Sequence, residues 1–313
     1  MKVFVAGATG AIGRPLVRQL VDAGHEVAGM TRSEARAEDI RRARATPVVC
    51  DAFDAEALRT AVGQAAPDVL VHQLTDLPRD WSMRYGYGAT SRLRSEGTGN
   101  LVEAARAAGA GRVVAQSIAF IYAPTGGPVK DEDEPTIRGT GDGAFATAVE
   151  ATLDLERRVT GTDGIDGLVL RYGFFYGPGT WYAHGTKLET AFKKRRFPIV
   201  GEGSGVFSFI HVEDAASATV AAVERGAPGI YNVADDAPAR MEEWAPAFAD
   251  AVGAQPPRRV PVWLAKLVAG KATVGMATTL RGASNAKAKR ELEWAPRYSS
   301  WRQGFREGLG ERA

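Results

Sequence analysis

The chain has 313 residues, enough for one large α/β domain or for such a domain with a smaller lobe. Its 39 lysines and arginines nearly balance 37 aspartates and glutamates, so the net charge of +2 gives no argument for nucleic acid or an anionic membrane as a partner. Cys50, the only cysteine, excludes an internal disulfide and suits a reducing compartment. No signal peptide and no apolar run of roughly 18 residues is present, so we expect a cytoplasmic protein.

A glycine-rich turn joins the first predicted strand to the first predicted helix. Residues 1–6 are an apolar run typical of a buried parallel strand, and apolar residues recur at helical spacing over 11–23. The glycines between them suit a tight turn, a close approach to a pyrophosphate and close packing of helix on strand, although such turns also occur without a ligand. The pattern predicts dinucleotide binding by Gly7, Thr9, Gly10, Ala11, Ile12 and Gly13.

The residues after the second predicted strand, 25–30, discriminate between cofactors. A carboxylate at this point would accept hydrogen bonds from a free ribose 2′-hydroxyl, but this chain has Thr31, Arg32 and Ser33. A guanidinium between two hydroxyls suits a 2′-phosphate, so the sequence predicts NADP(H) in preference to NAD(H). The alternative is an ordinary solvated surface arginine.

Asp51 and Ala52 follow the third predicted strand and are further candidates for cofactor contact. Asp51 is placed to reach the adenine amino group, although a turn role explains it almost as well. Asp54 is the expected N-cap of a helix over residues 55–62, which Gly63 is expected to end.

The fourth predicted strand, residues 68–72, leads into Gln73 and Leu74, which we expect beside the ribose on the nicotinamide side of the cofactor. His72 has no metal-ligating neighbours in the sequence, so we expect a packed histidine at the end of the strand and no metal site.

An irregular stretch at residues 78–88 lies where an open α/β fold places its ligands, at the carboxyl end of the sheet. Its aromatic residues Trp81 and Tyr85 are candidate substrate contacts. A long helix over 90–108 and a fifth strand over 112–117 are predicted next. Further helices are predicted over residues 144–156, 241–252, 262–273 and 286–291.

Several motifs occur in a characteristic order along nearly the whole chain. They are the Gly7/Gly10/Gly13 turn and residues 97–101, 117–122, 170–179, 209–216, 229–233 and 292–296. In this order the chain resembles the extended short-chain dehydrogenases/reductases of the epimerase/dehydratase superfamily. The resemblance implies an α/β fold with a Rossmann-type, doubly wound parallel sheet and a smaller C-terminal substrate-binding lobe. Residues 1–173 and 212–233 would form the NADP-binding domain, and residues 174–211 and 234–313 the lobe.

The resemblance also implies an active site with a tyrosine, a lysine four residues later on the same helix face, and a serine or threonine after the fifth strand. If Glu156 matches the acidic residue that follows this pair, Ala148 and Thr152 occupy the tyrosine and lysine positions. The hydroxyl position falls on Ile118, and Ser117 becomes a catalytic candidate only with a shift of one residue. We therefore expect an atypical member without the usual acid/base pair.

Other residues near the expected cleft are candidates to replace that pair. Tyr176 and Tyr182 are possible phenol donors, although each is more often a packing aromatic. His184 is a possible general acid or base, or a surface loop histidine. Ile118 and Tyr122 are expected to contact the substrate.

These observations favour an NADP(H)-dependent oxidoreductase, or an epimerase/dehydratase-like enzyme, that acts on a small polar or sugar-like metabolite. Two alternatives remain open: an NADP-binding, redox-sensing regulatory protein without turnover, and an enzyme that uses the same cleft for non-redox chemistry. A homodimer formed through the predicted helices at 90–108 and 144–160 is a hypothesis that follows from the resemblance.

Overall fold

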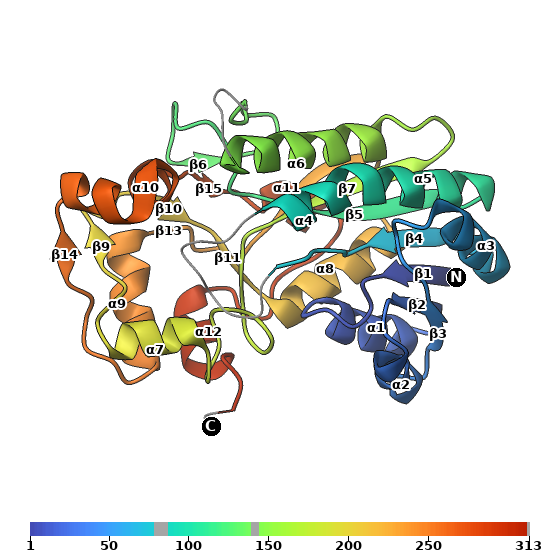
Figure 1. Ribbon diagram of the computed structural model, residues 1–313, viewed down its shortest axis with the longest axis horizontal. Coiled ribbons are helices and arrows are strands. Elements are labelled where there is room, and N and C mark those ends of the chain that lie inside the picture. Colours follow the sequence, from blue (N-terminus) through green and yellow to red (C-terminus); the bar gives the residue numbers. More distant parts are fainter. Residues whose placement is uncertain (78–86, 139–143, 312–313) are drawn as a thin grey trace.

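The computed structural model describes residues 1–77, 87–138 and 144–311. At its centre is a sheet of seven parallel strands, which confirms the predicted doubly wound α/β fold (Figure 1). The strand order is β12-β7-β5-β4-β1-β2-β3. The strands are β1 (Lys2–Ala6), β2 (Glu26–Thr31), β3 (Thr46–Val49), β4 (Val69–His72), β5 (Arg112–Ile118), β7 (Asp166–Tyr172) and β12 (Gly229–Val233).

Helices cover both faces of this sheet, which explains why its central strands are almost entirely apolar. On one face lie α1 (Gly13–Asp22), α2 (Glu34–Arg42) and α8 (Val212–Glu224), and on the other lie α3 (Ala55–Ala65), α5 (Thr98–Ala107) and α6 (Ala144–Thr160). Strand β1 supplies both cores, because Val3 and Val5 join the cluster under α1 and α8 while Phe4 and Ala6 join the cluster under α3, α5 and α6.

A further core, apart from the two that flank the sheet, lies to one side of the sheet in Figure 1 and is rich in aromatic residues. Trp244 packs against Phe209 and Tyr182 with ring centroids 5.4 and 5.7 Å apart, and Phe248 and Phe305 complete the group. The helices on this side are α7 (Lys187–Lys193), α9 (Met241–Ala251), α10 (Val262–Thr279) and α12 (Trp301–Glu307), and α11 (Ala286–Glu291) contacts β12.

Outside the central sheet, the described residues also form eight short strands, which pair two by two. Strand β8 (Phe174–Tyr176) follows β7 in the chain and pairs in parallel with β11 (Phe209–His211). Both short strands contribute side chains to the aromatic core. The other pairs are β10 (Val206–Phe207) with β13 (Ala239–Arg240), β9 (Ile199–Val200) with β14 (Arg259–Val260), and β6 (Val129–Lys130) with β15 (Gly282–Ala283).

Several predicted helices differ in extent from the observed ones, and helix α6 continues past the predicted residue 156 to Thr160. Helix α3 continues through Gly63 to Ala65 and ends at Ala66, whose φ is 42°, so the prediction that Gly63 ends the helix is wrong. A hydrogen bond from the Ala57 N–H to the Asp54 carboxylate confirms Asp54 as the N-cap. The helix predicted over 90–108 begins at Gly88 as α4 (Gly88–Arg92) and passes through a π-helical turn, η1 (Leu93–Gly97), before α5.

Helix α10 is longer than the predicted 262–273 and is interrupted. Gly270 has φ 79° and ψ 168°, a conformation that only glycine adopts readily, so the segment 262–269 is a separate helical arm. Within the described ranges, no helix is both long and apolar enough to cross a membrane.

Candidate dinucleotide and substrate site

The glycine turn after β1 is packed too tightly for side chains at two of its three glycines. A Cβ at Gly7, where φ is 96°, would lie 2.8 Å from the carbonyl oxygen of Gln73. A Cβ at Gly13 would lie 2.0 Å from the carbonyl oxygen of Gly7. Gly10 is exposed at the outside of the turn. The turn therefore presents bare backbone at the carboxyl end of β1, as a bound phosphate requires.

The N-terminus of α1 completes this cradle. The helix begins at Gly13, and Ile12 at its N-cap makes no side-chain hydrogen bond to the first turn. Ala11 lies against Gly179 from the loop after β8, because a Cβ on Gly179 would be 3.5 Å from the Ala11 Cβ. An uncapped helix start beside an exposed glycine fits the pyrophosphate of a dinucleotide.

The predicted 2′-phosphate site lies directly after β2. The Thr31 hydroxyl is buried, 3.5 Å from the Thr9 hydroxyl, and accepts a hydrogen bond from the Ser33 N–H. Ser33 is the N-cap of α2 but its side chain makes no capping hydrogen bond, and Arg32 is exposed to solvent. The structure thus brings two of the predicted segments together, and the NADP preference stays a prediction.

Asp51 and Ala52 occupy the next loop of the same edge. The Asp51 carboxylate accepts a hydrogen bond from the Phe53 N–H at 3.0 Å, which is the turn role considered from the sequence. Ala52 is buried, and its carbonyl oxygen accepts a hydrogen bond from Asn100 on α5. The free thiol of Cys50, immediately before this loop, is buried as well, and burial raises its pKa.

The end of β4 is held by buried side chains on both sides. Gln73 donates a hydrogen bond from Nε2 to the hydroxyl of Tyr172 at 3.2 Å, and within the described part of the chain its Oε1 is buried without a partner. Leu74 is half-buried next to it. A buried amide oxygen at the mouth of the glycine turn is available to a cofactor hydroxyl.

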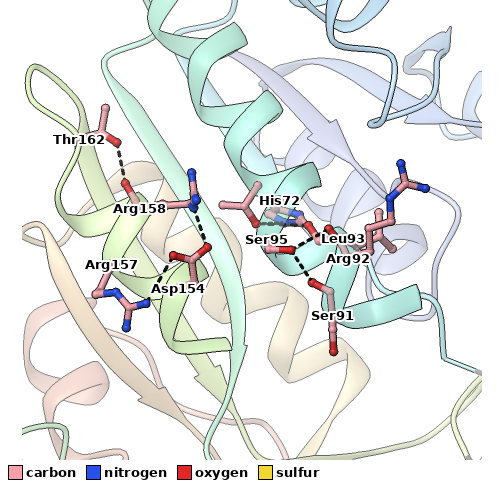
Figure 2. A network of polar contacts seen from close by, with 10 residues as sticks. His72, Ser91, Arg92, Leu93, Ser95, Asp154, Arg157, Arg158 and Thr162 are labelled. Carbon is pink, nitrogen blue, oxygen red and sulfur yellow. Dashed lines mark hydrogen bonds and ion pairs between the residues drawn. The ribbon is translucent and has the colours of Figure 1, made fainter. Parts of the chain in front are cut away.

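His72 is packed beneath η1, as Figure 2 shows, and not free for catalysis. Its Nε2 is 3.1 Å from the Thr98 hydroxyl, and its Nδ1 accepts a hydrogen bond from the Leu74 N–H. Burial and the positive charge of Arg94 lower the pKa of His72 from 6.5 to about 4. The prediction of a packed histidine at the end of the strand is confirmed.

This shift predicts a loss of stability in mild acid. The folded state keeps His72 neutral, whereas the unfolded chain binds a proton below pH 6.5, so the free energy of unfolding falls as the pH falls from 6.5 to about 4. The expected contribution is about 3 kcal/mol. Urea unfolding of the wild type and His72→Gln at several pH values measures it. Equal pH slopes for the two proteins in that range would contradict the prediction.

Ser117 lies in a buried polar network that sequence reasoning missed. Its hydroxyl donates a hydrogen bond to Glu156 at 2.6 Å, and Arg171 donates to both oxygens of the same carboxylate at 2.8 and 2.6 Å. Arg171 also donates to the hydroxyl of Tyr122, which in turn donates to Asn232. Burial raises the pKa of Tyr122 to about 12, although Arg171 opposes the shift. A catalytic role for Ser117 would require its hydroxyl to leave Glu156.

The α6 positions predicted to correspond to the family's acid/base pair, Ala148 and Thr152, are also buried. Thr152 donates a hydrogen bond from its hydroxyl to the carbonyl oxygen of Ala148 at 2.7 Å. The same hydroxyl accepts a hydrogen bond from the buried guanidinium of Arg94, which the π-helical turn η1 carries. A positive charge therefore lies near His72 at the end of β4, at a place where the sequence alone predicted none. Such turns often occur at functional sites.

Tyr176 and Tyr182 lie inside the aromatic core. Burial raises the pKa of both phenols, and within the described residues the hydroxyl of Tyr176 has no hydrogen-bond partner. His184 is close to Glu189, with 3.3 Å between Nδ1 and Oε1. Ile118 is half-buried at the end of β5, and the ring of Phe120, two residues later, stacks on Phe174 with ring centroids 4.4 Å apart. Trp81 and Tyr85 lie outside the described residues.

A parallel sheet whose first strand passes through a bare glycine turn into an uncapped helix defines a dinucleotide-binding fold. The profile of the NAD dependent epimerase/dehydratase family matches residues 3–234, and the chain belongs to this family of enzymes. The family predicted from the motifs is confirmed.

Curated relatives in this family include reductases. A 3-diazoavenalumate denitrifying reductase from a Streptomyces species is 49% identical over 309 residues, which cover 97% of this chain and 99% of the relative. A 4-hydroxy-2-methyl-3-oxo-4-farnesyl-3,4-dihydroquinoline-1-oxide ketoreductase from Stigmatella aurantiaca is 30% identical over 247 residues, 78% of this chain and 71% of the relative.

Solved structures share the fold at low sequence identity. The UDP-glucose 4-epimerase of Thermotoga maritima with UDP-glucose has a TM-score of 0.77 at 19% identity, covering 99% of this chain and 97% of the epimerase. The UDP-glucose 4-epimerase of Thermus thermophilus in complex with NAD has a TM-score of 0.75 at 22% identity, covering 99% of this chain and 98% of that epimerase.

Proposed function

We propose that this protein is a reductase that uses NADPH to replace the diazonium group of a small diazo substrate, written R–N₂⁺, with hydrogen. The observation that carries the proposal is the 49% identity, along almost the whole of both chains, to the denitrifying reductase. We propose that the cofactor binds to the domain formed by residues 1–173 and 212–233. The substrate would bind between this domain and the lobe formed by residues 174–211 and 234–313.

The polar groups of the site support this reaction over carbonyl reduction. Hydride transfer to a carbonyl produces an alkoxide, which needs a nearby proton donor. Three of the four candidate donors are unsuited to that task, because Ser117 is bonded to Glu156 and burial raises the pKa values of Tyr176 and Tyr182. In the reduction of a diazonium ion, the hydride forms a carbon–hydrogen bond and dinitrogen leaves. The hydride neutralises the positive charge, so no alkoxide forms and no proton donor is needed.

The balance of the proposed reaction is simple. When bound, NADPH would supply one hydride with its electron pair. The substrate R–N₂⁺ loses its carbon–nitrogen bond and gains a carbon–hydrogen bond, giving R–H, dinitrogen and NADP⁺. No further oxidant, reductant or proton is consumed.

This chain's own residues would bind and orient the two reactants. The turn of Gly7, Gly10 and Gly13 and the start of α1 hold the pyrophosphate, and Arg32 with its neighbouring hydroxyls holds the 2′-phosphate. Near the end of β5, half-buried Ile118 and the stacked rings of Phe120 and Phe174 form an apolar wall. A flat unsaturated substrate fits such a wall better than a sugar does.

The test is a stoichiometric assay with purified protein. A ¹⁵N-labelled benzenediazonium carboxylate serves as the probe, and mass spectrometry measures labelled dinitrogen while absorbance follows NADPH. We expect equal amounts of dinitrogen and NADP⁺, formed faster than with heat-denatured protein. Reduction of ketone probes without dinitrogen release, or epimerisation of UDP-glucose, would contradict the proposal. Tight NADPH binding without turnover of any probe would favour the regulatory alternative.

A further inference from the structure

The first segment of α10 exposes its large apolar side chains and buries its small one. Trp263, Leu267 and Val268 are 65%, 77% and 73% exposed, and Leu264 is also exposed. Ala265 of the same segment is buried. A surface helix ordinarily turns its large apolar residues toward the core, so this arrangement is the reverse of the usual one.

These side chains form one continuous face. Positions 264, 267 and 268 follow position 263 by one, four and five residues, so all four share one side of the helix. The break at Gly270 separates this arm from the rest of α10, and Val262 anchors its start, because a Cβ on Gly201 would lie 2.8 Å from the Val262 Cγ2. Figure 1 shows α10 at the opposite end of the molecule from β1, β2 and β3.

Exposed cations accompany this apolar face, although the net charge of the whole chain is only +2. Residues 251–290 contain eight lysines and arginines and no aspartate or glutamate, but Lys289 and Arg290 are paired with Asp236 and Glu291 away from the arm. Lys266 is exposed on the arm itself, and Arg258 is exposed just before it. Arg259 is bonded to Glu242 and contributes less.

We propose that the face Trp263, Leu264, Leu267 and Val268, together with Lys266, docks on the surface of an anionic phospholipid bilayer. The apolar face would enter the boundary between headgroups and acyl chains, and the cations would lie among the anionic headgroups. A second copy of this chain fits less well, because a twofold contact through the arm would bring Lys266 and its neighbouring cations against themselves. The proposal does not depend on the proposed enzymatic function.

The test is co-sedimentation with vesicles of phosphatidylcholine alone and of phosphatidylcholine mixed with phosphatidylglycerol. We expect binding to the mixed vesicles only, weakened by salt, with a blue shift of tryptophan emission. Leu267→Glu and Lys266→Glu should each weaken binding about tenfold or more. Val49→Glu replaces an exposed apolar residue on β3 and should leave binding unchanged, and none of these variants should alter the unfolding temperature.

Two results would overturn the proposal. One is failure of the wild type to bind mixed vesicles, or equal binding by wild type and Leu267→Glu. The other is a solution mass of two chains that Leu267→Glu converts to one chain, which would show that the face is an interface between copies.

Discussion

Replacing Glu156 with alanine is expected to lower the free energy of unfolding by about 3–5 kcal/mol. Glu156 and Arg171 are 4% and 3% exposed, and the carboxylate accepts hydrogen bonds from Arg171 and Ser117. Its removal leaves a guanidinium in the core without its counter-charge, which costs more than the pair contributes when intact. Equilibrium denaturation with urea at neutral pH measures the difference.

Two further variants separate the cause of this loss from simple loss of packing. Asp154→Ala removes a carboxylate from the same helix, but its partners Arg157 and Arg158 are largely exposed, so the expected change is below about 1 kcal/mol. Glu156→Leu combined with Arg171→Leu removes both charges and should recover much of the stability lost in Glu156→Ala. A double variant less stable than Glu156→Ala would contradict the electrostatic explanation.

Replacing Arg32 with alanine is expected to weaken NADPH binding about 10- to 100-fold and to leave NADH binding nearly unchanged. The reason is that hydrogen bonds to a charged group contribute about 1.5–3 kcal/mol each, and only NADPH carries the 2′-phosphate that Arg32 would bind. Calorimetric titration with both cofactors measures the two dissociation constants.

Arg41→Ala is the matched control, because Arg41 is an exposed arginine of the adjacent helix α2 and pairs with Glu38. It should change neither constant by more than about twofold. Arg32→Asp should reverse the preference, since a carboxylate accepts hydrogen bonds from a free 2′-hydroxyl and repels a phosphate. Equal losses of NADPH and NADH affinity in Arg32→Ala would contradict the prediction and would show that Arg32 contacts a part of the cofactor that both share.

The sheet could be predicted from the sequence because its strands are apolar runs with local turn signals. Reasoning from local sequence patterns failed where the extent of a helix is set by the surrounding structure or where the helix is too short to show a pattern. Gly63 sits on an exposed face with nothing near its Cβ position, so α3 tolerates it and continues to Ala65. The π-helical turn η1 contains only one large apolar residue, Leu93, so no apolar periodicity distinguishes it from an ordinary helix, and α7 and α12 are too short to show a periodicity.

The candidate site shows the same division. The glycine turn follows from spacing over seven residues, and the structure confirms that side chains would not fit at Gly7 and Gly13. The partner of Ser117 is Glu156, 39 residues away, and no local pattern joins them. A usable signal was present in Arg171, a lone cation within the apolar strand β7, because buried charges need counter-charges.

The way residues 292–298 fold back onto α8 has a consequence for the order in which the chain matures on the ribosome. Leu292 and Trp294 pack into the core beneath α1 and α8, and the indole of Trp294 donates a hydrogen bond to Ser217. Asp214 is likewise bonded to the backbone N–H groups of Arg297 and Tyr298. A nascent chain that has emerged only as far as residue 286 therefore holds every strand of the central sheet, yet it lacks residues 292–298, which pack beside α8 on one face of that sheet.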